Sequence, residues 1–442
     1  MSECKPITEL NFDNRNIQSL PIDTNEVKSV RQVSNAIFSL VEPMPVKSPK
    51  LMAYSKSVFE DLLGLRAPND TNDETVLSEY FGGNKVIPGS RPAAHCYCGH
   101  QFGNFAGQLG DGATMYLGEV INAKSGKRWE LQLKGAGKTP YSRTADGRKV
   151  LRSSVREFLC SEAMHFLGVP TTRAGTCVTS DSTVQRDPMY DGGVIDERCT
   201  IVSRIASNFF RFGSFEIFKP KSDDGDFDGR AGPSAGNAAL KQQLLDHILL
   251  YYPNIANNPE YSSTTQRYEQ MYIEIVRRTA FLVARWQAVG FVHGVLNTDN
   301  MSIMGLTIDY GPFGFLEHYD PQYVPNGSDN SARYSYQEQP AMCAWNLGKL
   351  AEVLEPLLSG DAAQSALQQY DRLYEGYYQA MMGAKFGFLG RLLSPGDHAL
   401  VSSFFEALAA TSADFTDAFV ALTDFVAQLE QAELTAGTVY VH

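Results

Sequence analysis

The sequence predicts an α+β fold with two lobes, in which a strand-rich N-lobe with one key helix precedes a helical C-lobe. Over 113–134, apolar residues alternate with polar ones around a Lys-Ser-Gly turn at 124–126, which is typical of paired strands. From residue 238 on, apolar residues recur at the three-to-four spacing of helices. At roughly 100–200 residues per domain, 442 residues suit two or three domains or one large two-lobed unit.

The predicted elements divide the chain into three parts: an irregular N-terminal wrap over 1–90, the N-lobe over 91–215 and the C-lobe over 238–431. The key helix of the N-lobe is expected over 153–167, and short Thr- and Val-rich segments follow it. Between the lobes, 219–237 is charged, rich in Gly and poor in large apolar residues, which predicts a loop. The lobe boundary is therefore expected between about 205 and 240.

Composition excludes several classes of protein. Hydrophobic residues make up 43% and charged residues 20%, which are globular values. No run of about 18 uncharged apolar residues predicts a membrane-spanning segment, so no membrane partner is expected. The 38 Lys and Arg against 50 Asp and Glu give a net charge of −12, which argues against a nucleic-acid binder. An anionic ligand would therefore need a local basic site.

The cysteines and the N-terminus bear on the compartment. The seven cysteines form no C-x-x-C pair, which favours a reducing compartment over a disulfide framework or a zinc site. The polar, acidic start of the chain has the features of neither a signal peptide nor a transit peptide. We therefore expect a cytoplasmic protein.

A local basic site is predicted after the second strand, where Lys134 ends the strand. Asp146 is the only acid between Lys134 and Arg156. A polyphosphate is the ligand that such a cluster favours. The seven basic residues of this segment are Lys134, Lys138, Arg143, Arg148, Lys149, Arg152 and Arg156.

The segment from Gly107 to Gly112, Gly-Gln-Leu-Gly-Asp-Gly, allows two interpretations. Glycines at Gly110 and Gly112 would let backbone amides approach a phosphate. Asp-Gly before a strand also favours a hairpin turn. The two interpretations are compatible, because phosphate-covering loops of kinases are themselves hairpins.

Glu157 lies near the start of the predicted helix and also allows two interpretations. In kinase-like folds, a helix glutamate holds the strand lysine against nucleotide phosphates, and Glu157 would hold Lys134 in this way. Alternatively, Ser154 and Glu157 form a capping box at the start of the helix. The spacing does not choose between them.

The segment from His293 to Asn300, followed by Asp309-Tyr-Gly, has the spacing of the kinase catalytic loop and metal-binding turn. In that pattern, Asn300 and Asp309 would hold Mg²⁺. The position of the activating Asp is Val295, which takes no proton, so Asp299 is the nearby carboxylate that could replace it. The alternative is that these residues are buried strand ends and an Asn-rich turn.

Taken together, these motifs resemble the selenoprotein O family of kinase-like protein adenylyltransferases. The resemblance also includes the segment with Arg204 and Arg211. The matching segments occur in the family's order between residues of about 90 and 355. The matching segments are YCGHQFGNFAGQLGDG, LQLKGAGKTPYSRTADGRKVLRSSVREF, SRIASNFFRFGSFE, WQAVGFVHGVLNTDNMSIMGLTIDYGPFGFLE and RYSYQEQPAMCAWNLGKLAE.

The resemblance implies a protein-kinase-like fold that binds ATP in an inverted orientation. It implies transfer of AMP to Ser, Thr or Tyr hydroxyls of proteins, with release of pyrophosphate and with Mg²⁺ (or Mn²⁺) as the metal. Asp299 would be the proton acceptor, and Asn300 and Asp309 the metal ligands. The residues implied in nucleotide binding are Gly110, Gly112, Lys134, Asp146, Gly147, Glu157, Arg204, Arg211 and Asp309.

Three further points follow from the resemblance. Relatives occur in mitochondria as well as in bacterial cytoplasm, so a mitochondrial location is the alternative. Many bacterial members carry Arg where this chain has Ala113, and family members usually extend beyond the position of its last residue. A nucleotide-binding pseudokinase scaffold and a conventional phosphotransferase using Asp299 as base remain the alternative functions.

Overall fold

The computed structural model describes residues 4–221, 229–388 and 393–424, and contacts divide it into two compact units. The first comprises Met1–Val276, Asn297–Gly311 and Asn346–Ala366. The second comprises Arg277–Leu296, Pro312–Trp345 and Leu367–His442. The N-terminal wrap and the two lobes were expected from sequence patterns, not from contacts, and they stay predictions. Residues 1–3 of the expected wrap, 222–228 of the expected loop and 425–431 of the expected C-lobe lie outside the described residues.

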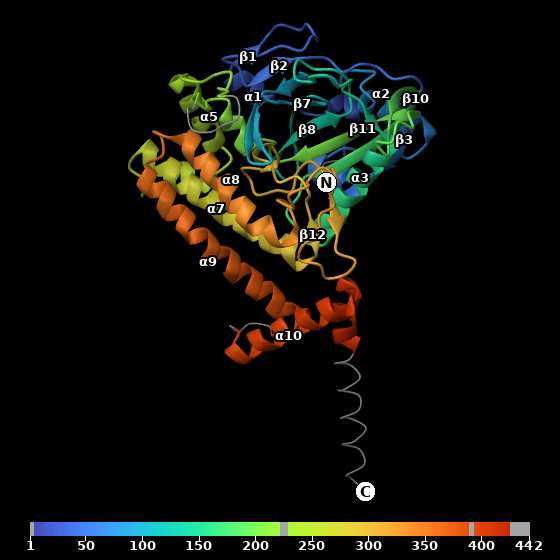
Figure 1. Cartoon of the computed structure of the whole chain (residues 1–442). Helices are drawn as coiled ribbons and strands as arrows, with labels where there is room; N and C mark the ends of the chain where they lie inside the picture. Colours follow the sequence, from blue (N-terminus) through green and yellow to red (C-terminus); the bar gives the residue numbers. More distant parts are fainter. Residues whose placement is uncertain (1–3, 222–228, 389–392, 425–442) are drawn as a thin grey trace. The chain divides into compact units, whose positions relative to one another are not determined.

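A nine-stranded sheet forms the centre of the first unit, and the α+β class is confirmed (Figure 1). The strand order is β1-β2-β4-β7-β8-β11-β10-β3, with β9 paired to β11. All pairings are antiparallel except that of β1 with β2. The strands are β1 (Ile22–Asp23), β2 (Phe38–Leu40), β3 (Lys50–Tyr54), β4 (Ala93–His95), β7 (Thr114–Ile121), β8 (Arg128–Lys134), β9 (Lys149–Val150), β10 (Arg173–Arg186) and β11 (Ile195–Ala206).

Strands β7 and β8 confirm the strands expected over 113–134. Leu131 and Leu133 of β8 alternate with polar residues and are fully buried, as the period of two predicts. The alternate residues Glu130, Gln132 and Lys134 are buried as well. Both faces of β8 are therefore covered, and its polar face is enclosed within the protein.

Helix α3 (Leu151–Phe166) confirms the expected helix and packs against β10 and β11 (Figure 1). Its Phe158 joins a buried cluster with residues of these strands, so that an apolar stripe fixes the helix on the sheet. The proposed capping box is wrong. The helix begins at Leu151, which places Ser154 inside it, and the Ser154 hydroxyl lies 2.5 Å from that of Thr200.

A separate two-stranded sheet of β5 (Cys98–Gln101) and β6 (Asn104–Gln108) lies against α4 (Phe212–Glu216) and the 3₁₀ helix η3 (Thr298–Asn300). Because β6 is not paired with β7 in the described sheets, the chain from Gly107 to Gly112 connects two sheets and is not a simple hairpin turn. The other short elements are η1 (Ile7–Glu9), α1 (Arg15–Ser19), η2 (Val58–Leu63), α2 (Thr71–Phe81), α5 (Ala238–Leu249) and α6 (Pro253–Ala256).

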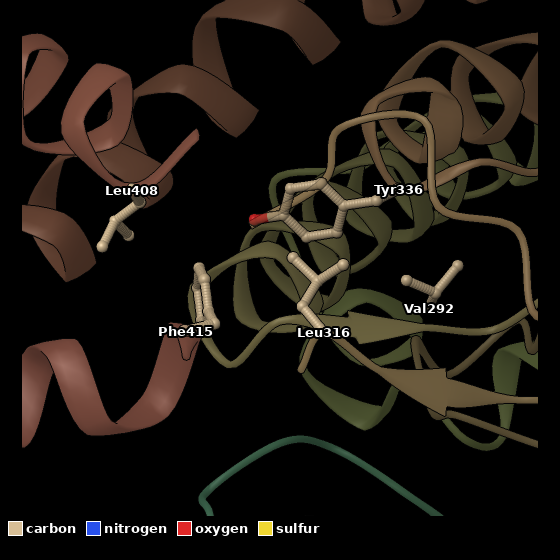
Figure 2. Close-up of a cluster of buried hydrophobic side chains, with 5 residues drawn as sticks. All are labelled: Val292, Leu316, Tyr336, Leu408 and Phe415. Atoms are coloured by element: carbon tan, nitrogen blue, oxygen red, sulfur yellow. The ribbon is translucent and has the colours of Figure 1, made fainter. Parts of the chain in front are cut away.

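The second unit has its own apolar core, shown in Figure 2. In this view the ring of Tyr336 lies above Leu316, and Phe415 lies to the left of Leu316. The elements of this unit are β12 (Phe291–Val292), β13 (Gly314–Phe315), η4 (Tyr336–Glu338) and α10 (Pro395–Thr411). The long helices α7 (Thr264–Ala288), α8 (Gln339–Leu354) and α9 (Gly360–Lys385) each contribute residues to both units. Among the described residues, no helix is both long and apolar enough to cross a membrane.

Candidate nucleotide and catalytic site

Asp309 lies at the centre of a group of three cationic side chains in the first unit. Its Oδ1 accepts hydrogen bonds from Lys134 Nζ at 3.3 Å and from the Arg204 guanidinium. Its Oδ2 accepts from Arg211 Nη1 at 2.7 Å. Burial raises the pKa of Asp309, but these three charges outweigh burial and hold the pKa well below its usual value. Asp309 therefore remains an ionised carboxylate at neutral pH.

Lys134 is held by Glu157 as the kinase comparison predicted. Lys134 Nζ lies 2.7 Å from Glu157 Oε2, and both side chains are largely buried. Lys134 ends β8, and Glu157 lies on the second turn of α3. In protein kinases, this pairing holds the lysine against the nucleotide phosphates. The structure therefore supplies the geometry, while the role itself stays a prediction.

The sheet places Arg204 beside Lys134. Arg204 of β11 lies opposite Gln132 of β8, and residues two apart on a strand share a face, so Lys134 lies on the same face. The Arg204 guanidinium donates to Gln132 Oε1 at 2.8 Å and lies 3.6 Å from Glu157. The hydrogen bond to Gln132 and the ion pair with Glu157 fix the guanidinium of a nearly fully buried arginine.

Arg211 connects Asp309 with the segment that contains Asp299. It directly precedes α4, and its Nη1 donates both to Asp309 and to the backbone oxygen of Asp299 at 2.8 Å. Its guanidinium lies over the Tyr97 ring at 4.5 Å from the centroid and 4.0 Å from Asp111. This buried arginine thus holds together the two parts of the kinase-like pattern, the segment of Asp299 and the turn of Asp309.

Asp299 occupies a confined environment. Its Oδ1 is buried and makes no hydrogen bond among the described residues. Burial raises the pKa of Asp299 to about 7; the charge of Arg211 opposes the shift, and the charge of Glu216 adds to it. A side chain at Gly99 would place its Cβ 2.5 Å from Oδ1, so the glycine leaves room for this carboxylate. A carboxylate with a pKa near 7 is suited to accept a proton at neutral pH.

The hydroxyl of Thr298 fixes the chain directly before Asp299. It donates to Glu216 Oε2 at 2.7 Å and accepts from the backbone amide of His100 at 2.7 Å. His100 Nδ1 lies 2.6 Å from the other oxygen of Glu216. Strand β5, helix α4 and helix η3 therefore meet at this buried carboxylate.

Asn300 and Asp309 have the chemistry expected of magnesium ligands. Among the described residues, no three His, Cys, Asp or Glu side chains come together as a metal cage. Mg²⁺ in nucleotide sites commonly binds one or two protein oxygens together with phosphate oxygens. Asp309 is ionised, and 22% of its side chain is exposed, whereas Asn300 adjoins Asp299 on η3. These residues fit a metal ion that a nucleotide helps to bind.

Gly110 and Gly112 contribute close packing. Gly110 has φ +71°, and a Cβ there would lie 2.3 Å from Cγ of Tyr141. At Gly112, a Cβ would lie 2.9 Å from the Tyr141 backbone oxygen. The amides of Gly110 and Asp111 donate to the backbone oxygens of Tyr97 and His95. Because these amides already have acceptors, binding a phosphate through them would require the loop to move.

Asp146 and Gly147 are not part of the Asp309 group. Asp146 forms an ion pair with Arg186 at 2.7 Å and accepts the amide of Arg148 at 2.9 Å. Gly147 has φ +72°, and a Cβ there would lie 2.1 Å from the backbone oxygen of Gly137. Their expected contacts with a nucleotide stay predictions.

The basic residues expected to form one site are dispersed in space. Lys149 lies close enough to Lys134 for that charge, together with burial, to lower the pKa of Lys149. Arg148 donates to backbone oxygens, including that of Met44 at 3.0 Å, and Arg152 is paired with Glu197. The sequence analysis therefore overestimated how many basic residues gather at one site. Residues that are close in sequence point in different directions from a strand or a helix.

Comparison with known protein families matches residues 22–436 to the family described as protein adenylyltransferase SelO. The chain belongs to the SelO family. It is 53% identical over 433 residues to "Protein adenylyltransferase SelO, mitochondrial" of Homo sapiens, covering 96% of this chain and 64% of that protein. It is 52% identical to "Protein adenylyltransferase SelO-1, mitochondrial" of Danio rerio, covering 98% of this chain and 63% of that protein.

A bacterial member of the SelO family is also similar. "Protein nucleotidyltransferase YdiU" of Nitrosospira multiformis is 46% identical over 408 residues, which cover 92% of this chain and 68% of that protein. The chain thus spans slightly less than two thirds of the length of the animal relatives named above. Membership of the SelO family confirms the resemblance on which the expected residue roles rest.

Several residues of the site had not been predicted. Gln132, Glu216 and Thr298 lack a motif of their own, and each acts through a partner distant in the sequence. Asp111 is a buried acid near Arg211, and burial raises its pKa although Arg211 opposes the shift. Asp111 itself had been noted only as part of an Asp-Gly turn signal. Of these residues, only Gln132 could have been found from the sequence, because the alternation of polar and apolar residues in β8 places it on the same face as Lys134.

Proposed function

We propose that this chain is a Mg²⁺-dependent protein adenylyltransferase, which moves AMP from ATP to Ser, Thr or Tyr hydroxyls of proteins. The observation that carries the proposal is the pairing of Asp299, a confined carboxylate with a pKa of about 7, with the cations around Asp309. Val295, at the position of the kinase base, cannot accept a proton. The names of the relatives in the SelO family agree with adenylyl transfer.

In the proposed reaction, the acceptor hydroxyl oxygen bonds to the α-phosphorus of ATP. The bond from that phosphorus to the oxygen bridging to the β-phosphate breaks, and pyrophosphate leaves. Asp299 takes the hydroxyl proton. Lys134, Arg204 and Arg211 offset the charge of the phosphates, which is the main form of catalysis in phosphate chemistry.

The metal would bind at Asn300 and Asp309 together with the phosphates. When bound, Mg²⁺ or Mn²⁺ neutralises phosphate charge and orients the leaving group. Arg204 and Arg211 support the inverted orientation of ATP, because a triphosphate turned around in the site requires countercharges at positions that differ from those in kinases.

Labelling with ATP decides between the reaction types. ATP labelled at the α-phosphate and ATP labelled at the γ-phosphate are each incubated with the chain, Mg²⁺ and a mixture of acceptor proteins. We expect protein labelling from the α-label only, and Asp299→Asn should abolish it. Label from the γ-phosphate alone would instead favour a conventional phosphotransferase that uses Asp299 as base.

A nucleotide-binding scaffold is the second alternative. If the chain is a scaffold, Asp309→Ala should remove metal-dependent ATP binding and leave the cellular role intact. If the chain is an enzyme, the same substitution removes the role. A cytoplasmic location and the absence of a nucleic-acid partner stay predictions. The animal relatives are themselves named as mitochondrial proteins.

A further inference from the structure

The ring of Tyr97 supports the guanidinium of Arg211 from one face. The guanidinium carbon lies 4.5 Å from the ring centroid, which is within the range of cation–π attraction. Both residues are buried, with 7% of Tyr97 and 1% of Arg211 exposed. Cation–π attraction is strongest where water is excluded, because water screens the charge. The contact can therefore hold the guanidinium in place.

Oxygen atoms hold the edge of the same guanidinium. Nη1 of Arg211 donates to Oδ2 of Asp309 at 2.7 Å and to the backbone oxygen of Asp299 at 2.8 Å. Nη2 lies 4.0 Å from Oδ1 of Asp111, and Nε makes no hydrogen bond among the described residues. Because the N–H groups of a guanidinium lie in its plane, these oxygens restrict movement within the plane. The ring of Tyr97 adds a restraint on movement out of the plane.

The contact involves a neutral ring and not a phenolate. Burial raises the pKa of the Tyr97 hydroxyl well above its usual value, although the charge of Arg211 opposes the shift. The hydroxyl therefore stays protonated at neutral pH. The attraction comes from the electron-rich face of the ring, which phenylalanine would also supply.

The backbone of Tyr97 connects Arg211 with the Gly107–Gly112 segment. Its carbonyl oxygen accepts the amides of Leu109 at 2.9 Å and of Gly110 at 3.0 Å. The ring and the carbonyl belong to one residue, so a displacement of this segment would also displace the support of the guanidinium. Tyr97 thus fixes the position of Arg211 relative to the segment.

We propose that Tyr97 is a positioning residue, whose ring holds the guanidinium of Arg211 where it meets the phosphates of ATP. The proposal rests on the proposed function, which assigns Arg211 to those phosphates. A guanidinium that is already held in place loses less conformational freedom when it binds a phosphate, so the affinity for the nucleotide is higher. An aliphatic side chain at position 97 would fill space without attracting the charge.

The test varies the electron density of the ring and keeps its size. Tyr97 is replaced by Phe and by Phe with one, two or three ring fluorines, which withdraw electron density from the face of the ring. The ligand is Mg²⁺ with an ATP analogue that has a methylene group between the α- and β-phosphates, so no transfer occurs. We expect Tyr97→Phe to bind it within about twofold of the unmodified chain, and the Kd to rise with each fluorine, by about five- to tenfold in total. Isothermal titration calorimetry measures this.

A second fluorinated series separates cation–π attraction from packing. Phe59 is fully buried, and its aromatic neighbours among the described residues are Tyr54 and Phe81, so no cation faces it. The same fluorines at Phe59 should leave the Kd unchanged. Tyr97→Leu, which removes the ring, should raise the Kd about 10- to 30-fold. Thermal unfolding shows which variants are folded, and the fluorinated series stays decisive if Tyr97→Leu is not.

The outcomes separate the positioning role from the proposed function. Equal Kd values across the series at position 97 would overturn the positioning role, and so would an equal rise in the series at Phe59. A loss in Tyr97→Phe as large as that in Tyr97→Leu would also overturn it, because the hydroxyl would then be the contact. If the Kd follows the fluorines but ATP labels no protein, adenylyl transfer fails and the positioning role stands. If neither ATP nor the analogue binds, both proposals fail.

Discussion

His100 Nδ1 lies 2.6 Å from Oε1 of Glu216, and both side chains are buried. The second oxygen of Glu216 accepts the Thr298 hydroxyl, so this pair positions the residue directly before Asp299. A buried carboxylate with two such donors holds a loop in one conformation, because an unsatisfied donor in either partner would be costly.

Glu216→Gln should lower the rate of AMP transfer more than it lowers nucleotide affinity. The amide nitrogen cannot accept a hydrogen bond, so either His100 or Thr298 loses its acceptor, and Asp299 loses its fixed position. We expect kcat to fall about 10- to 100-fold, with a small change in the KM for ATP.

Glu162→Gln provides the matched control for this substitution. Glu162 is a carboxylate of α3 that accepts from Arg173, so its loss also removes a partly buried ion pair. Both variants should lose stability, but only Glu216→Gln should lower kcat per folded molecule. Equal kcat values in the two variants would contradict a positioning role for Glu216.

Lys134 and Glu157 should act as a unit. Lys134→Met removes the proposed phosphate contact and leaves Glu157 without its closest cation, and Glu157→Gln releases Lys134 from its position. Each substitution alone should lower AMP transfer about 100- to 1,000-fold. The double variant should be little worse than either, as is usual for residues that act together. Steady-state kinetics of the three variants measures this, and fully additive losses would show that the two residues act independently.

Local patterns predicted much of this site. The alternation around 124–126 and the helix signal after it located β8 and α3, and with them Lys134 and Glu157. The kinase-like spacing located Asp299 and Asp309. These features were readable because each depends on residues close together in the chain.

What escaped prediction depends on distant segments. Gln132 contacts Arg204, and Glu216 contacts His100, across sequence separations of 72 and 116 residues. Sequence alternation marked Gln132 as polar, but only the fold shows that this polar face of β8 is enclosed. The capping box failed for a related reason, because Thr200 of β11 provides the partner of Ser154.

Gly110→Ala should destabilise the protein more than an alanine at another left-handed glycine. Its Cβ would meet the Tyr141 ring in addition to the strain of φ +71°. Gly126 has φ +67° and open space around it, so Gly126→Ala measures the strain alone. We expect Gly110→Ala to cost about 1–3 kcal/mol more in urea unfolding, because ring and loop must move apart. Equal losses in the free energy of unfolding for the two variants would mean that the Tyr141 ring moves aside without a measurable cost.

Glu130 should make the free energy of unfolding fall as pH rises. Glu130 and Glu119 are directly opposed on β8 and β7, and both are buried. Burial, together with the charge of Glu119, raises the pKa of Glu130 to about 8, although hydrogen bonds from Gln132 and Phe209 oppose the shift. Between the unfolded pKa of about 4.3 and the folded value, the folded state binds more protons. The stabilisation is therefore complete below the unfolded pKa and is lost as pH rises through the folded one.

Glu130→Gln removes this titration, so the difference in stability between the variant and the unmodified chain isolates it. That difference should shift in favour of the variant by about 3–5 kcal/mol between pH 4.5 and pH 8, and then level off. Urea unfolding across this range measures it. Glu162→Gln should show the opposite sign, at pH values below about 4.5. Burial raises the pKa of Glu162, but hydrogen bonds from Arg173 and Ser55 outweigh it and lower that pKa, so the stabilisation by Glu162 is lost as pH falls. A pH-independent difference for Glu130→Gln would mean that Glu130 is ionised in the folded protein, with Asn16 and Gln132 sufficient to stabilise its charge.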